Sequence, residues 1–73
     1  MQLHRPPPTS ILVNGERVAT GACTLADLVA EQGFAAAAVA TAVNGAFVPR
    51  AARAATQLAA DDKVEIVAPR QGG

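Results

Sequence analysis

Apolar and polar residues alternate most clearly near the end of the chain, over residues 63–68. Val64 and Ile66 fall on one face of an extended backbone, since successive side chains of a strand point to opposite faces. The other face carries Lys63, Glu65 and Val67. The pattern predicts a half-buried strand, and Pro69 ends it because proline lacks the backbone donor that a ladder needs.

Two Asn-Gly pairs, Asn14-Gly15 and Asn44-Gly45, stand between apolar segments. This dipeptide is typical of two-residue hairpin turns, because both of its residues tolerate the positive φ that such turns require. We therefore expect two hairpins, the second of which ends at Pro49. Their strands cover residues 10–13, 16–20, 39–43 and 46–48.

One amphipathic stretch predicts the main helix, over residues 25–32. Thr24 occupies the N-cap position and Asp27 follows three residues later, a pair that resembles a capping box. Gly33 suits the left-handed position that ends a helix. The apolar stripe has the i, i+3, i+4 spacing of one helix face and consists of Leu25, Leu28 and Val29.

The remaining segments are short. The alanines of residues 35–38 show no periodicity, and we interpret them as a connection into the second hairpin. Residues 51–58 are also rich in alanine, and we expect a short helical turn there. Asp61-Asp62 is expected to form the last tight turn, before the final strand.

The element order is therefore strand-strand-helix-strand-strand-strand. If the last strand lies between the hairpins, beside the first strand, the sheet is mixed and the helix covers one of its faces. This arrangement is an α+β fold of the β-grasp, or ubiquitin-like, type, with about five strands. We expect a disordered proline-rich leader over residues 1–9, the domain over residues 10–69, and a flexible Gly-Gly tail over residues 70–73.

Composition narrows the classes of partner. The 73 residues carry six basic and six acidic side chains, with no basic patch and no set of aromatic residues for stacking, so nucleic acid is not expected as a partner. No apolar run approaches the length of a membrane span, and no signal peptide is evident. A single cysteine, Cys23, favours a reducing, cytoplasmic location, and we expect it to be a half-buried structural thiol.

The chain ends in Gly72-Gly73, which has two possible meanings. A terminal diglycine can be an ordinary flexible end. It can also be a chemical handle, because it has no side chains and can enter a narrow channel in another protein. The two glycines by themselves do not decide between these meanings.

Further residues carry a resemblance to a known family. They are Ala42-Val43-Asn44-Gly45, Val48-Pro49-Arg50, Leu58, residues 62–67 and Gln71-Gly72-Gly73. In this order they resemble the ThiS family, the sulfur carrier proteins of thiamine biosynthesis, over roughly residues 10–73. Two positions depart from the family pattern: Arg53 stands near a position where the family often has an aromatic residue, and Asp61-Asp62 replaces the usual glycine-aspartate turn.

The resemblance implies a protein cosubstrate and not an enzyme. A ThiF-like adenylyltransferase, using ATP with magnesium, would join AMP to the carboxylate of Gly73. A persulfide derived from a cysteine desulfurase would then displace AMP, and a ThiG-like thiazole synthase would accept sulfur from the resulting thiocarboxylate. The carrier itself would bind no cofactor and no metal. Gly72, Gln71 and Arg70 would give the tail access to the partner's active site.

Docking also requires a surface. Because the helix covers one face of the sheet, the other is open, and we expect Val67 on it, with Phe47 and Val48 as candidate neighbours. A shift of one residue exchanges the faces, so the sequence leaves open which of Phe47 and Val48 points outward. Three other functions stay possible: a MoaD-like carrier for molybdopterin synthesis, a ubiquitin-like interaction module without sulfur chemistry, and a modifier conjugated to lysine.

Overall fold

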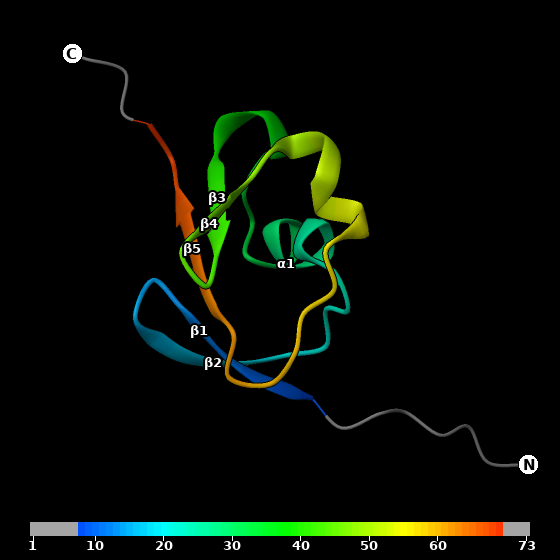
Figure 1. The fold of residues 1–73 in the computed structure, drawn as a ribbon, viewed down its shortest axis with the longest axis vertical. Coiled ribbons are helices and arrows are strands. Elements are labelled where there is room, and N and C mark those ends of the chain that lie inside the picture. The colour runs from blue at the N-terminus through cyan, green and yellow to red at the C-terminus, as the bar shows by residue number, and fades with distance from the viewer. Residues whose placement is uncertain (1–7, 70–73) are drawn as a thin grey trace, which may run out of the picture.

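The structure is a computed structural model, and it describes residues 8–69. A five-stranded sheet packs on one α-helix, with two short 3-10 helices beside it (Figure 1). The strands are β1 (Thr9–Val13), β2 (Glu16–Thr20), β3 (Ala40–Val43), β4 (Ala46–Val48) and β5 (Lys63–Val67). The helices are α1 (Leu25–Glu31), η1 (Ala36–Ala38) and η2 (Arg50–Ala55).

The strand order is β2-β1-β5-β3-β4, so the last strand lies at the centre of the sheet. β5 runs parallel to β1 and antiparallel to β3, and each hairpin is antiparallel. The sheet is therefore mixed, and the prediction that the last strand enters between the hairpins is confirmed.

Both hairpins turn at the predicted Asn-Gly pairs. Asn14 and Gly15 have φ values of 51° and 86°, and Asn44 and Gly45 have 52° and 83°. Positive φ at both central residues matches the right-handed twist of the strands, which is why this dipeptide is favoured there.

Helix α1 begins and ends where its capping residues stand. The Thr24 hydroxyl accepts a hydrogen bond from the backbone N–H of Asp27 at 3.2 Å, and this satisfies one of the free donors of the first turn. Gly33 follows the helix with φ of 85°, the left-handed conformation that glycine adopts without penalty. Gln32, predicted as the last helical residue, is the C-cap.

The core lies between α1 and one face of the sheet. β5 alternates as predicted, with Val64 and Ile66 buried and its other three residues exposed. The three apolar residues of the helix stripe are fully or almost fully buried against them. The buried apolar set is Ile11, Val13, Leu25, Leu28, Val29, Val39, Val48, Val64 and Ile66.

Several element boundaries differ from the prediction. β3 begins at Ala40 and β5 ends at Val67, and each is one residue shorter than predicted. β1 begins at Thr9, one residue early, and the connection before β3 contains the 3-10 turn η1. The predicted helical turn over residues 51–58 is a 3-10 helix that begins at Arg50 and ends at Ala55. The predicted tail and most of the predicted leader lie outside the described residues. Within residues 8–69, no helix is long and apolar enough to span a membrane.

Candidate functional site

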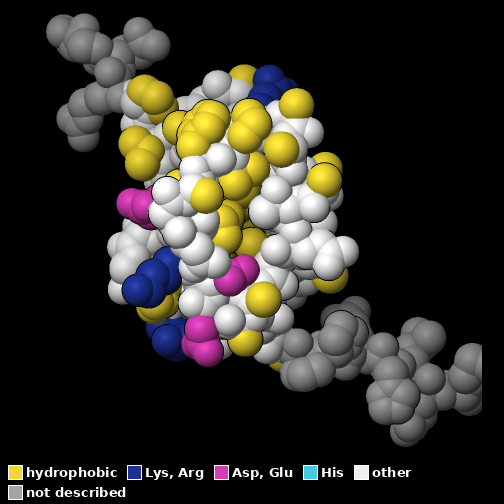
Figure 2. All heavy atoms as spheres, in the orientation of Figure 1, with side chains coloured by type: hydrophobic (Ala, Val, Ile, Leu, Met, Phe, Trp, Pro, Cys, Tyr) yellow, Lys and Arg dark blue, Asp and Glu magenta, His cyan; other side chains and the backbone are white. Residues whose placement is uncertain are grey.

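The sheet face opposite α1 carries the two exposed large apolar residues of the described chain. Phe47 on β4 is 70% exposed and Val67 at the end of β5 is 57% exposed. Figure 2 shows apolar side chains gathered around the end of β5 and its neighbours, close to where the C-terminal trace leaves the domain. An exposed apolar patch of this kind typically marks a contact surface.

A shallow hollow of about 150 Å³ lies between these two residues. Ala42 pairs with Phe47 and with Glu65, and Ala40 pairs with Val67, so these side chains share one face of the sheet. The two alanines are short, and they leave a depression between larger neighbours. The residues around it are Ala40, Thr41, Ala42, Phe47, Glu65 and Val67. We call this region the apolar face.

The placement of Val48 on this surface is wrong. Val48 is only 9% exposed and belongs to the core. Neighbouring residues of a strand point to opposite faces, so an outward Phe47 requires an inward Val48. β4 has only three residues, too few for its pattern to indicate which of them faces the helix.

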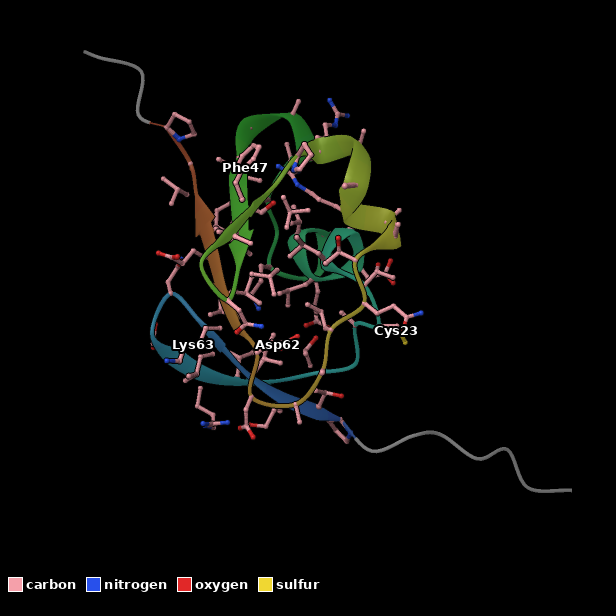
Figure 3. The ribbon with its side chains drawn as sticks, in the orientation of Figure 1. Cys23, Phe47, Asp62 and Lys63 are labelled. Carbon is pink, nitrogen blue, oxygen red and sulfur yellow. The ribbon has the colours of Figure 1, made fainter. Side chains whose placement is uncertain are left out.

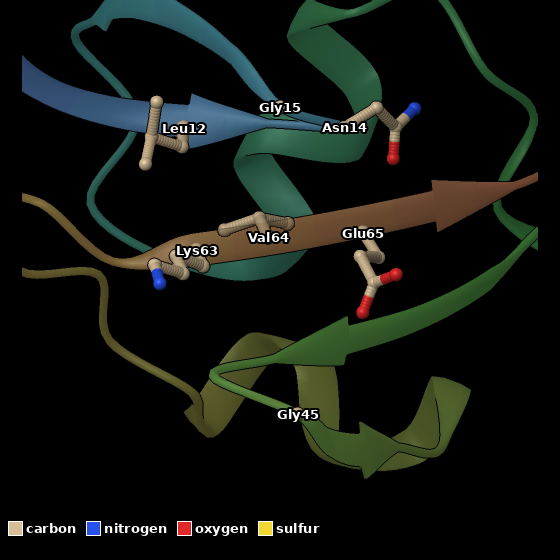
Figure 4. A pocket seen from close by; sticks show the side chains of 7 residues that line it. All are labelled: Leu12, Asn14, Gly15, Gly45, Lys63, Val64 and Glu65. Atoms are coloured by element: carbon tan, nitrogen blue, oxygen red, sulfur yellow. The ribbon is translucent and has the colours of Figure 1, made fainter.

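A larger groove, of about 700 Å³, lies beside the apolar face and between the two hairpin turns (Figure 4). Lys63 and Glu65 project from β5 on the same side, between Gly15 of one turn and Gly45 of the other. The lining residues are Leu12, Asn14, Gly15, Gly45, Lys63, Val64 and Glu65. Glu65 borders both hollows, so the groove and the apolar face are continuous along β5.

Asn14 does more than form its turn. Its side-chain amide accepts a hydrogen bond from the N–H of Ile66 at 2.9 Å and donates one to the carbonyl of Ile66 at 3.0 Å. The parallel ladder between β1 and β5 has only two paired positions, and the Asn14 amide extends it in the manner of a backbone group.

Asn44 holds β5 from the other side. Its side chain accepts a hydrogen bond from the N–H of Lys63 at 3.0 Å and donates one to the carboxylate of Asp62, also at 3.0 Å. The sequence pattern predicts both asparagines as turn formers only. The preference for Asn at a positive φ masks a second preference, for an amide that can both donate and accept.

The largest surprise is Arg53, which is 4% exposed. Its guanidinium donates three hydrogen bonds, to the carbonyls of Ala36 at 2.8 Å and Val39 at 2.6 Å and to the Thr41 hydroxyl at 3.0 Å. The Thr41 hydroxyl in turn donates to the Val48 carbonyl at 2.9 Å. Within residues 8–69 no carboxylate pairs with this charge.

Arg53 therefore connects η2 to η1, to β3 and, through Thr41, to the end of β4. A solvated surface would be the usual place for an arginine in an alanine-rich segment. The one signal that distinguishes it in the sequence is its position near a place where the ThiS family often has an aromatic residue.

Cys23 is exposed, which corrects the expectation of a half-buried thiol. It lies in the loop between β2 and α1, well away from Phe47 in the view of Figure 3. Residues 8–69 contain no cluster of His, Cys, Asp or Glu that could hold a metal ion.

The comparisons with known proteins agree with the geometry. The model of the ThiS family matches residues 11–73. The chain belongs to the ThiS family. A solved structure of the thiamine biosynthesis protein ThiS from Geobacter metallireducens superposes with a TM-score of 0.74 at 29% identity. The match covers 89% of this chain and 100% of that one. A search of curated proteins gives no match.

This ThiS family member joins its apolar face directly to its C-terminal segment. β5 ends at Val67, a member of the apolar face, and Ala68 and Pro69 are exposed beyond it. The other predicted site residues, Arg70, Gln71, Gly72 and Gly73, lie outside the described residues. A partner that covers Phe47 and Val67 would therefore contact the domain beside the point where these residues begin.

Proposed function

We propose that this protein is the sulfur carrier of thiazole formation in thiamine biosynthesis, a cosubstrate and not an enzyme. The observation that carries the proposal is the match to the ThiS family, which extends through Gly72-Gly73 to residue 73. The apolar face beside the end of β5 supports it, because a carrier must be held by each enzyme that acts on its tail. The reducing cytoplasm is the compartment that suits such chemistry.

The proposed chemistry takes place at the carboxylate of Gly73. A carboxylate is a poor electrophile, so a ThiF-like adenylyltransferase would first join it to AMP from ATP, with release of pyrophosphate. A persulfide derived from a cysteine desulfurase would attack the acyl carbon and displace AMP. Cleavage of the resulting S–S bond by a thiol would leave the thiocarboxylate, whose sulfur a ThiG-like thiazole synthase would accept.

The carrier's own part is to present the tail. Gly72 would keep the partner's channel free of a Cβ atom, and Gln71 and Arg70 would form hydrogen bonds along its entrance, as an added strand does. The ATP and the magnesium would be held by the adenylyltransferase.

Intact-mass analysis tests the proposal. The chain is incubated with its cognate ThiF-like enzyme, ATP and a persulfide source, and we expect exchange of one oxygen for one sulfur. Deletion of Gly73 should abolish the exchange. Absence of any exchange in the wild-type chain would refute the proposal. Growth that requires thiamine after gene deletion, and not loss of molybdoenzyme activity, would distinguish the thiamine pathway from a MoaD-like role.

The apolar face gives a prediction of its own. Phe47→Ala removes the largest exposed apolar side chain, and we expect it to weaken binding to the adenylyltransferase by about tenfold or more, as loss of an aromatic anchor does. Unfolding by urea should be almost unchanged, because Phe47 is 70% exposed. The control is Gln32→Ala, at an exposed position at the end of α1. If calorimetry gives equal affinities for both variants, Phe47 is not part of the interface.

A further inference from the structure

Glu65 occupies a position that limits what can cover the sheet. It is exposed at the centre of β5, and its carboxylate has no hydrogen bond or ion pair with any other residue in the range 8–69. Val67 lies on its tail side, and Phe47 lies in the same row across Ala42. On the other side lies Leu12, which pairs with Lys63 and lines the groove. An acidic group thus separates two apolar areas of one continuous surface.

The neighbouring charges do not neutralise it. Leu12 pairs with both Arg17 and Lys63, so these three side chains form one row across the sheet. Arg17 already donates to the carboxylate of Asp61, at 2.8 Å. Lys63 has a long stem and lies at the start of β5, so its ammonium group can stay in water when the face is covered. Glu65 has a shorter side chain and lies two residues further along β5.

Covering the apolar areas on both sides would therefore remove water from Glu65. An ionised carboxylate that loses its water without gaining a partner is strongly unfavourable, whereas a cation with good geometry offsets that loss. The open space in front of the turns makes the groove accessible: a Cβ atom built on Gly15 or on Gly45 would meet nothing within 4 Å.

We infer that the docking face extends beyond Phe47 and Val67 into the groove between the Asn-Gly turns, and that a segment of the adenylyltransferase fills it with a basic side chain against Glu65. This inference rests on the proposed function and adds the chemistry of the partner's surface. The partner segment places apolar residues at the tail end of β5, the cation over Glu65, and a further apolar residue over Leu12. Arginine suits the position best, because its planar fork pairs with a carboxylate through two bonds.

The test is calorimetric titration of the cognate ThiF-like adenylyltransferase with the full-length chain and its variants, at low and at high salt. Glu65→Gln keeps the shape and removes the charge, and we expect it to weaken binding by about tenfold and to reduce the effect of salt. Glu65→Lys should weaken binding further. Glu16→Gln is the matched control, since Glu16 is also exposed but lines neither hollow, and its affinity should stay within about twofold of wild type.

The outcomes separate the inference from the proposed function. If wild type binds and acquires sulfur but Glu65→Gln binds equally well or more tightly, the inference is overturned and the carrier function stands. If sedimentation shows that the chain forms a dimer that Glu65→Lys disrupts, the occupant is a second copy and the inference is wrong. If wild type neither binds the enzyme nor acquires sulfur, both the inference and the proposed function are refuted. Equal melting temperatures of Glu65→Gln and wild type exclude an effect through folding.

Discussion

Arg53→Met is expected to lower the free energy of unfolding by about 2–4 kcal/mol, because it leaves two buried acceptors and one partly buried acceptor without their donor. Those acceptors are the carbonyls of Ala36 and Val39 and the hydroxyl of Thr41. Burial of a charge without a carboxylate is itself costly, so part of the loss is offset when the guanidinium is removed. The effect is a large fraction of the stability of a 73-residue domain.

Urea denaturation, with the slope compared between variants, measures this effect. The chain offers a matched control in Arg50→Met, which changes the same residue type in the same 3-10 helix, at an exposed position. We expect that control to stay within about 0.5 kcal/mol of wild type. Arg53→Lys keeps the charge but not the fork, so it should fall between wild type and Arg53→Met. An Arg53→Met protein as stable as wild type would show that the three bonds only balance the burial of the charge.

Asn14→Asp is expected to lower the free energy of unfolding by about 2–3 kcal/mol at neutral pH. A carboxylate can still accept from the N–H of Ile66, but it cannot donate to the Ile66 carbonyl and places a negative charge against it. Asn14→Gly keeps the positive φ of the turn and removes only the side-chain bonds, and should cost about 1–2 kcal/mol. A smaller loss of stability in Asn14→Asp than in Asn14→Gly would contradict this account.

Two measurements locate the effect of the Asn14 variants. Amide hydrogen exchange should accelerate at Ile66 in Asn14→Gly, because its N–H loses its acceptor. At acidic pH the difference in free energy of unfolding between Asn14→Asp and wild type should become smaller, because the protonated carboxyl can donate to the Ile66 carbonyl. We expect the fold to favour the protonated form of the introduced carboxyl, so that its pKa is raised above the value in the unfolded chain. The associated stability is present at low pH and is lost as the pH rises through that pKa.

The contacts of Arg53 and Asn14 are the part of the fold that the sequence pattern does not predict. Asn14 was interpreted correctly as a turn residue, because the positive φ of its turn is a property of a few consecutive residues. Its bond to Ile66 joins positions 52 residues apart, and no local pattern contains it. Arg53 was noted only as a departure from the ThiS family pattern, and its burial depends on carbonyls that η1 and β3 present together.

The parts of this protein that depend on short-range interactions are evident in the amino-acid sequence alone. The Asn-Gly pairs set both hairpins, Thr24 and Gly33 set the ends of α1, and the alternation over residues 63–67 set the inner and outer faces of β5. The element order, together with the resemblance, then indicated the β-grasp sheet.

Which side chains meet, by contrast, depends on the folded sheet and is evident only in the structure. It placed Phe47 outward and Val48 in the core, because three residues of strand are too few to reveal their orientation without the sheet around them. It brought Glu65 between Val67 and Leu12, which belong to strands from opposite ends of the chain. Burial and desolvation depend on all neighbours at once, and for this reason the chemistry of the docking face is not evident from any single stretch of sequence.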